Sequence, residues 1–232
     1  MSRKLPSHLS HHTVSIFSPP PESYDAEVAR LLNDDNSVKY LTHHHSVHPS
    51  ILSDLTSTSD IRRPELIWTV EDVKARRAVQ EREHEARESW FGVATEDDAF
   101  AGVCSLKSID WCNKSAEMGI CLLADFWRRA ITDQCHFIVL QHAFEGLLLH
   151  RISFTIVGEN DAMKSYFRKV LDASHEGTLK ESFLDNSGRY HDSELYSIIA
   201  PQWPSLKASL HHRIISAAEF PRHGHLKEHL II

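Results

Sequence analysis

The residues best suited to chemistry lie in residues 126–132, between two apolar segments. Before them, residues 117–123 are short, apolar and alternating, which predicts a buried strand. After them, apolar residues recur at helical spacing from Ile131 to Gly146. A strand that turns directly into a helix gathers unpaired backbone N–H groups at the positive end of the helix dipole. Such a place suits an anion, especially a phosphate.

Two adjacent arginines, Arg128 and Arg129, support a phosphate site in this turn. Their guanidinium groups would add positive charge and planar donor forks at the same place. An ordinary strand-to-helix connection with two solvated arginines explains the turn equally well when it is taken alone. The segments that follow decide between these two interpretations.

The pattern of strand, turn and helix repeats after residue 146. Residues 150–157 alternate as a strand, and they lead to a helix for which Asn160 is the expected N-cap. One face of that helix is apolar and includes Phe167. A last alternating strand ends near Ile199. In this half of the chain the strands are therefore linked by strand-helix-strand crossovers.

The first half of the chain predicts an antiparallel meander. Residues 13–17 form a first strand that ends at a run of prolines. Residues 90–94 and 100–106 form two strands joined by a hairpin at 96–98, and residues 115–123 continue the sheet. Because the later strands are linked by helices, the sequence predicts one mixed sheet with helices on both faces.

Two helices are expected in the first half. One is opened by Ser23 and closed near Asn33, with an apolar face. Another begins at Thr69 with an acidic residue three positions later, and residues 71–88 of it are mostly charged, which indicates a solvated face. Residues 34–67 are irregular and are interpreted as a loop on the substrate side.

Taken together, the chain resembles the GNAT superfamily of acyl-CoA N-acyltransferases, most closely its branch of ribosomal-protein alanine acetyltransferases, RimJ and RimL. The resemblance rests on motifs that follow the family's order and spacing: Glu117, Gly119, 149–152, Asn160, Lys169, 176–177 and 188–192. Each motif is weak alone, and the set is specific. The resemblance implies an α+β fold built on a central twisted mixed sheet of about seven strands with helices on both faces.

The resemblance also implies a reaction, which is transfer of an acetyl group from acetyl-CoA to a primary amine by direct attack, without a metal ion. The acceptor would be a small molecule or a protein N-terminus. The cofactor-binding residues that the resemblance implies are Cys121, Leu122, Trp127, Arg128, Arg129, Ala130, Ile131, Thr132, Asn160 and Phe167. The implied catalytic residues are Glu117, as a base or an orienting carboxylate, and Tyr166, as a proton donor.

Several positions depart from the family pattern. Ala130 and Thr132 stand where relatives have glycines that let the backbone approach the diphosphate. Phe167 stands where many relatives have the tyrosine that protonates the leaving thiolate, and Tyr166 points about 100° away from it on a helix. Residues 171–172 replace a Gly-Phe pair, which alters the wall on the acceptor side.

These departures leave two alternatives open. Glu117 is a catalytic carboxylate or a strand carboxylate paired with a neighbouring Lys or Arg. The whole chain is an acetyltransferase, or it is a GNAT scaffold that has lost acetyl transfer and either binds a ligand or partner or catalyses another reaction in the same cleft.

Composition excludes several classes of protein. The formal net charge of −7 and the lack of a basic stripe argue against nucleic-acid binding. The chain has no run of about 18 apolar residues and no secretory signal at its start, so neither a membrane span nor export is expected. Four cysteines without metal or redox spacing are interpreted as reduced, which predicts a cytoplasmic protein.

The length of 232 residues fits one domain with an extension. We expect the acyltransferase domain in residues 1–204 and a histidine-rich tail in residues 205–232. That tail is either a helix packed on the body or on the second subunit of a homodimer, or a loosely ordered end. Residues 43–48 contain four histidines, and the flanking Ser, Thr and Pro favour a solvated loop over a metal site.

Overall fold

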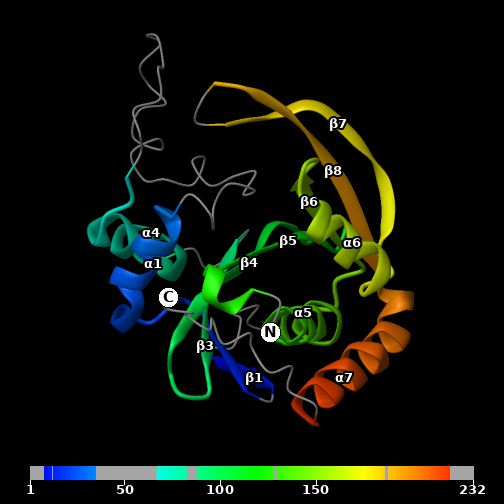
Figure 1. Ribbon diagram of the computed structural model, residues 1–232, viewed down its shortest axis with the longest axis horizontal. Coiled ribbons are helices and arrows are strands. Elements are labelled where there is room, and N and C mark those ends of the chain that lie inside the picture. The colour runs from blue at the N-terminus through cyan, green and yellow to red at the C-terminus, as the bar shows by residue number, and fades with distance from the viewer. Residues whose placement is uncertain are drawn as a thin grey trace, which may run out of the picture.

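The computed structural model describes residues 8–11, 13–34, 67–82, 88–127, 130–185 and 188–219. They form one eight-stranded sheet in the order β1-β2-β3-β4-β5-β6-β8-β7, with helices around it (Figure 1). The strands are β1 His8–His11, β2 Val14–Phe17, β3 Ser89–Thr95, β4 Phe100–Asp110, β5 Ser115–Leu122, β6 Arg151–Val157, β7 Ser174–Leu184 and β8 Tyr190–Ile199. The helices are α1 Asp25–Leu32, α4 Val70–Arg82, α5 Ile131–Gln141, α6 Asp161–Lys169 and α7 Trp203–Glu219. The predicted α+β fold with a mixed sheet is confirmed.

Strands β1 to β5 form the predicted antiparallel meander, and β5 and β6 are joined by a parallel ladder. The chain crosses between these two parallel strands through a short 3₁₀ turn, Ala124–Phe126, and then α5. Strand β1 is an addition to the prediction. Its four residues carry too short an alternation to identify a strand, and only pairing with β2 reveals it.

Two separate cores hold the helices on the two faces of the sheet. The main core packs α5, α6 and α7 against β4, β5, β6 and β8, with large members such as Leu140, Phe154 and Tyr196 fully buried. The second core lies under α1 and α4 and includes Val28, Trp68 and Val73. This two-faced arrangement, also visible in Figure 1, confirms helices on both sides of the sheet.

Polar contacts stabilise the end of α1 and the start of α4. Asn33 closes α1 as predicted and receives the Trp68 N–H on its side-chain oxygen at 2.8 Å, while its amide donates to the Trp68 carbonyl at 2.7 Å. Thr69 and Asp72 exchange side-chain-to-backbone bonds at 2.9 and 3.2 Å, so the predicted capping of α4 is confirmed. The start of α1 differs slightly, because Ser23 lies in a 3₁₀ turn and α1 itself begins at Asp25.

The charged face predicted for residues 71–88 contains an exception. Arg77 of α4 is buried and donates to the buried Asp25 of α1, and its Nε donates to the Pro20 carbonyl oxygen at 2.9 Å. A charged side chain enters a core only with such partners. This ion pair therefore fixes how α1 and α4 lie against each other.

The C-terminal extension packs on the body as far as residue 219. Leu206, Leu210 and Ile214 of α7 belong to the main core. The Trp203 indole N–H and the Lys207 ammonium both reach Glu145 Oε1, at 2.7 Å each. Of the two alternatives for this segment, the helix packed on the body is the one observed for residues 205–219.

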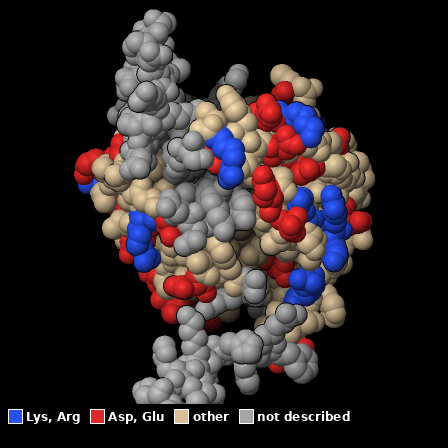
Figure 2. Space-filling view, turned by 45° about the horizontal axis from the view of Figure 1, so that its top comes forward, with Lys and Arg blue, Asp and Glu red and all other residues tan. Residues whose placement is uncertain are grey.

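Charged groups of both signs stand next to one another on the face shown in Figure 2. Ion pairs also occur elsewhere on the surface of the described residues, for example between Lys180 and Asp192, at 2.7 Å. Within the ranges that the structure describes, none of the helices is both long and apolar enough to cross a bilayer. The predicted loop of residues 34–67 and the histidine run at 43–48 lie outside the described residues, apart from the loop's two end positions.

Candidate functional site

Strands β5 and β6 separate part-way along their length. Their parallel ladder holds only three pairs, the last of which joins Glu117 to Ser153. Beyond this pair, β5 stays on β4 as far as Leu122, and β6 stays on β8 as far as Val157. Each strand thus presents an edge that no other strand covers within the described residues. We call the space between these edges the wedge.

The direction of the backbone shows which groups of β5 face the wedge. The Leu123 N–H donates to the Ala101 carbonyl oxygen at 3.0 Å, so it points toward β4. In a trans peptide the preceding carbonyl, that of Leu122, points the opposite way, toward the wedge. The N–H and C=O of one strand residue point to the same side of the strand, and this side alternates from one residue to the next. The backbone groups of Leu122 and Ile120 therefore face the wedge, whereas those of Cys121 face β4. Of the two predicted donors on this strand, Leu122 is placed at the wedge and Cys121 is not.

The start of α5 lies next to the end of β5. Ala130 is the N-cap of α5, and no side chain caps the helix there. The first N–H groups of α5, including those of Ile131 and Thr132, therefore have no cap among the described residues. Trp127 precedes them and is 42% exposed. Arg128 and Arg129 lie outside the described residues.

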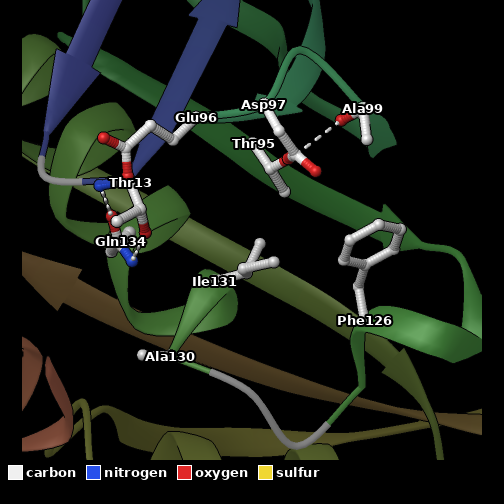
Figure 3. A pocket seen from close by; sticks show the side chains of 9 residues that line it. All are labelled: Thr13, Thr95, Glu96, Asp97, Ala99, Phe126, Ala130, Ile131 and Gln134. Carbon is white, nitrogen blue, oxygen red and sulfur yellow. Dashed lines mark hydrogen bonds between the residues drawn. The ribbon is translucent and has the colours of Figure 1, made fainter. Parts of the chain in front are cut away.

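A pocket of about 480 Å³ opens beside this helix start (Figure 3). Ile131 points to the middle of the group of lining residues, with Phe126 on one side and Gln134 on the other. Gln134 is held there by Thr13, whose backbone N–H donates to Gln134 Oε1 at 3.1 Å. The other lining residues are Thr95, Glu96, Asp97, Ala99 and Ala130. The predicted helix start is thus reachable from a cavity.

Glu117 stands at the narrow end of the wedge, in its last paired position. Its carboxylate lies 3.1 Å from the Lys107 ammonium of β4, and both side chains are largely buried. The side chain points to the face of the sheet that carries α1 and α4, because the neighbouring Ala116 and Met118 point into the main core on the other face. The predicted pairing with a neighbouring Lys is confirmed, and such a pair holds the carboxylate in one orientation.

Asn160 begins α6 as predicted. Its Oδ1 accepts the Met163 N–H at 3.2 Å, which is the expected capping bond. This bond uses only the oxygen, and within the described ranges the side-chain NH₂ group is left for a ligand. The preceding Gly158 is bonded to β8, with its N–H donating to the Asp192 carbonyl oxygen at 2.9 Å. The position that would bond the pantetheine arm is therefore attached to both α6 and β8.

Tyr166 points toward α5 and joins a buried polar network. Its hydroxyl donates to Asp133 Oδ1 at 2.9 Å, and Arg213 of α7 lies 3.2 Å from the other carboxylate oxygen. Burial, with Asp133 adjacent, raises the pKa of Tyr166 well above its usual value. Tyr166 therefore keeps its proton and bridges α5 and α6. Its predicted role as proton donor to a thiolate stays a prediction.

Two other aromatic side chains of this region are buried. Phe167 is 2% exposed and packs on Phe154 and Tyr196, with ring centroids 4.7 and 5.4 Å away. Burial lowers the pKa of His136 to about 4, and its Nδ1 lies 2.8 Å from the Thr132 carbonyl oxygen. His136 is therefore neutral near pH 7. Phe167 is placed in the core, so its predicted contact with the cofactor stays a prediction.

Comparison with known proteins identifies the fold. The family model described as acetyltransferase (GNAT) domain matches residues 16–170, more than half of the chain. This chain belongs to the GNAT acetyltransferase family. The predicted family is thereby confirmed, and the wedge and the uncapped start of α5 are the places at which to look for its site.

Individual relatives of this GNAT protein are distant. A candidate ribosomal N-acetyltransferase of Bacillus subtilis (strain 168), YdaF, is 25% identical over 111 residues, which are 48% of this chain and 60% of that relative. The matched stretch thus spans less than two thirds of the relative's length. In structure, the chain is similar to a candidate acetyltransferase from T. thermophilus, with TM-score 0.68, 21% identity and coverage of 90% and 98% of the two chains. It is also similar to spermidine N-acetyltransferase from Vibrio cholerae in complex with CoA and spermine, with TM-score 0.65, 18% identity and coverage of 84% and 99%.

Sequence reasoning missed a charged cluster that joins the β7–β8 hairpin of this GNAT protein to the start of α6. His191 places Nδ1 2.8 Å from Glu159 Oε1 and Nε2 2.8 Å from Asp185 Oδ2. Arg189 also faces the ring, with Nε 3.3 Å from Nε2. The hydrogen bonds to Asp185 and Glu159 raise the pKa of His191 above its usual 6.5. No periodic pattern marks this cluster, because Glu159 precedes α6 while Asp185, Arg189 and His191 belong to the β7–β8 hairpin.

The His191 cluster predicts a pH-dependent contribution to stability. Because its pKa is raised on folding, the contribution is fully present below pH 6.5 and is lost as the pH rises through the folded pKa. The free energy of unfolding of the wild type minus that of His191→Gln should therefore be largest in mild acid and shrink above neutrality. Denaturant titrations over this pH range measure the difference.

The variant His212→Gln is the matched control for this prediction, because His212 is an exposed histidine of α7. Its difference from the wild type, measured over the same pH range, is the reference for replacing a histidine outside the cluster. A His191→Gln difference that does not change with pH would contradict the assignment of a charged His191 between two carboxylates.

The cysteines and the other histidines offer no further centre among the described residues. Cys104, Cys121 and Cys135 are buried, and Cys112 is exposed. Burial raises the pKa of Cys121 and of Cys135 to about 12, so these thiols stay protonated. No group of three or more His, Cys, Asp and Glu side chains in the described ranges is arranged to hold a metal ion.

Proposed function

We propose that this protein is an acetyl-CoA-dependent N-acetyltransferase that acetylates a primary amine by direct attack. The observation that carries the proposal is the separation of β5 and β6 beside the uncapped start of α5. An open strand edge can bond the amides of an extended pantetheine arm, and a free helix start can bond a diphosphate. The two surfaces meet at the end of β5, which suits a ligand that has both parts.

The proposed roles follow from the position of each residue. The N–H groups of Ala130, Ile131 and Thr132, with Arg128 and Arg129, would bind the diphosphate. The edge N–H of Leu122 and the side-chain amide of Asn160 would bind the arm. Backbone and amide donors of this kind match the acceptors that a diphosphate and an amide-containing arm present.

In the proposed reaction the amine nitrogen attacks the thioester carbonyl carbon, and the C–S bond breaks to release the thiolate. Glu117 would take the proton from the amine, directly or through a water molecule. The edge N–H of Leu122 or Ile120 would donate to the carbonyl oxygen as its charge grows. Tyr166 would return a proton to the thiolate, which requires its hydroxyl to leave Asp133.

The acceptor would reach Glu117 from the face of the sheet that carries α1 and α4. A solved relative was crystallised with spermine, and the relative YdaF is described as a ribosomal N-acetyltransferase, so both polyamines and protein N-termini belong in the first acceptor panel. Amino-acid amides and aminoglycosides complete it. Release of free CoA thiol measures turnover.

A second candidate function is a GNAT scaffold that binds a ligand or partner without acetyl transfer. It is favoured by Ala130 and Thr132, whose side chains stand where bare backbone approaches the diphosphate in relatives, and by Phe167, which has no proton to give. Calorimetry with acetyl-CoA separates the candidates. No heat at millimolar acetyl-CoA would reject the proposed enzyme and leave the scaffold.

The binding site is tested by reversing its charge. We expect the double variant Arg128→Glu, Arg129→Glu to bind acetyl-CoA at least about a hundredfold more weakly than the wild type, because two charge-assisted contacts become repulsions. Calorimetric titration measures the dissociation constants. The pair Arg30→Glu, Lys74→Glu, on α1 and α4, changes the net charge equally on the opposite face of the sheet and is the control. Equal affinity in both double variants would place the diphosphate elsewhere.

A further inference from the structure

The side chain of Trp127 reaches back from the start of α5 to the wedge. Its indole N–H donates to the Leu122 carbonyl oxygen at 2.8 Å. That carbonyl points away from β4, as the bond from Leu123 to Ala101 requires, so the indole lies at the uncovered edge of β5. A side chain from the helix entrance is thus bonded to the strand edge that faces the proposed cofactor arm.

The chain between the two bonded residues is a single tight turn. Within it the Phe126 N–H donates to the Leu123 carbonyl oxygen at 2.9 Å, and the Trp127 N–H donates to the Ala124 carbonyl oxygen at 3.1 Å. These bonds shape the turn itself. The indole bond differs, because it joins the far end of the turn to the strand. It therefore holds Trp127 against the edge of β5.

The indole bonds only one of the two backbone groups that Leu122 presents at the strand edge. It occupies the carbonyl of Leu122, whereas the N–H of the same residue, on the same side of the strand, is not bonded to any other strand in the part of the chain that the structure describes. Occupation of the carbonyl by Trp127 is therefore compatible with an arm bonded through the N–H. Three positions after Trp127, Ala130 begins α5 without a side-chain cap among the described residues.

We propose that Trp127 is a positioning residue for the diphosphate of acyl-CoA, an inference that rests on the proposed function. Its indole holds the entrance of α5 at a fixed place relative to the edge of β5. The first N–H groups of α5 and the edge N–H of Leu122 then form one rigid frame, on which diphosphate and pantetheine arm bind together. Residues 130 and 132 are Ala and Thr where relatives have glycines, so the backbone has less freedom to adjust to the ligand. A fixed position of the α5 entrance is therefore more important for binding.

The test separates the two parts of the ligand. The probes are CoA and pantetheine, which lacks the diphosphate and nucleotide. Dissociation constants are measured by calorimetry for CoA and by competition for pantetheine, in the wild type and in Trp127→Phe. We expect CoA to bind about tenfold more weakly to the variant, the equivalent of one lost hydrogen bond, and pantetheine to bind within about twofold of wild type.

Two further proteins make the comparison sharper. Tyr190→Phe, a change at a 60% exposed aromatic residue of the β7–β8 hairpin, should leave both constants unchanged. Replacement of Trp127 by benzothienylalanine keeps the shape of the indole and removes only its N–H donor, so a loss of affinity for CoA cannot be attributed to misfolding.

Each other outcome overturns the inference. If CoA and pantetheine lose affinity by the same factor, Trp127 supports the arm or the fold and has no special role for the diphosphate. If neither loses affinity, the indole bond has no part in binding. If the wild type itself binds neither compound, the proposed function fails and this inference fails with it, whereas normal binding by the wild type confines any failure to Trp127.

Discussion

Replacing Glu117 by glutamine is expected to lower kcat by about a hundredfold, if the carboxylate is the base of the proposed reaction. Glu117 lies in the last pair before β5 and β6 separate, and the Lys107 ammonium holds its carboxylate at 3.1 Å. Glutamine keeps the shape and loses the ability to accept a proton. Release of free CoA thiol with a saturating acceptor measures the effect.

The companion variant Lys107→Gln distinguishes the base from a structural ion pair. If Glu117 serves only that pair, the two single variants should lose the same free energy of unfolding and have similar turnover. If Glu117 is the base, Glu117→Gln should lose far more turnover than Lys107→Gln. A kcat of Glu117→Gln within about threefold of wild type, together with lower stability, would reject the catalytic role.

Replacing Asp25 by asparagine is expected to lower the free energy of unfolding by about 3–5 kcal/mol. Asp25 and Arg77 are 4% and 6% exposed, and their side chains are bonded to each other. Without the carboxylate, the Arg77 guanidinium stays buried. Its remaining partners among the described residues are the Pro20 carbonyl and a Glu22 oxygen 4.0 Å away. Chemical denaturation followed by circular dichroism measures the change.

The exposed pair Lys74 and Glu71 of α4 is the control for this prediction, because its Nζ and Oε1 are 2.9 Å apart on the surface. Glu71→Gln should leave stability almost unchanged, because solvent screens an exposed pair. The double variant Asp25→Leu, Arg77→Met should recover most of the loss, since it removes both charges. A loss below about 1 kcal/mol in Asp25→Asn would show that Arg77 finds solvent or another acceptor.

Much of the fold could be predicted from local patterns. The alternation in residues 100–106 and 115–123, the capping signals of Thr69 and Asn160, and the helical spacing after Ile131 all correspond to observed elements. Each of these signals acts over a few residues, through backbone geometry and the burial of one face. The family motifs are of the same local kind, which explains why they could be recognised in order.

The partner of Glu117 could not be predicted in this way. Asp110 pairs with Ser115, and an unbroken ladder would therefore place Ser108 opposite Glu117. The register shifts between Lys107 and Asp110, with Ser108 at a φ of 53°, and Lys107 takes that place instead. A bulge of this kind moves side chains from one face of a strand to the other.

The sequence by itself determined most of the strands and helices in their order, the capping residues Thr69 and Asn160, and the strand-to-helix turn at which an anion is expected. Only the tertiary structure decided that Arg77 is buried, that β5 and β6 separate after Glu117, and that the indole of Trp127 bonds the exposed edge of β5. The physical reason is the distance along the sequence over which each effect acts. Propensity and periodicity act between neighbours in sequence, whereas burial, register and open edges depend on which distant segments pack together.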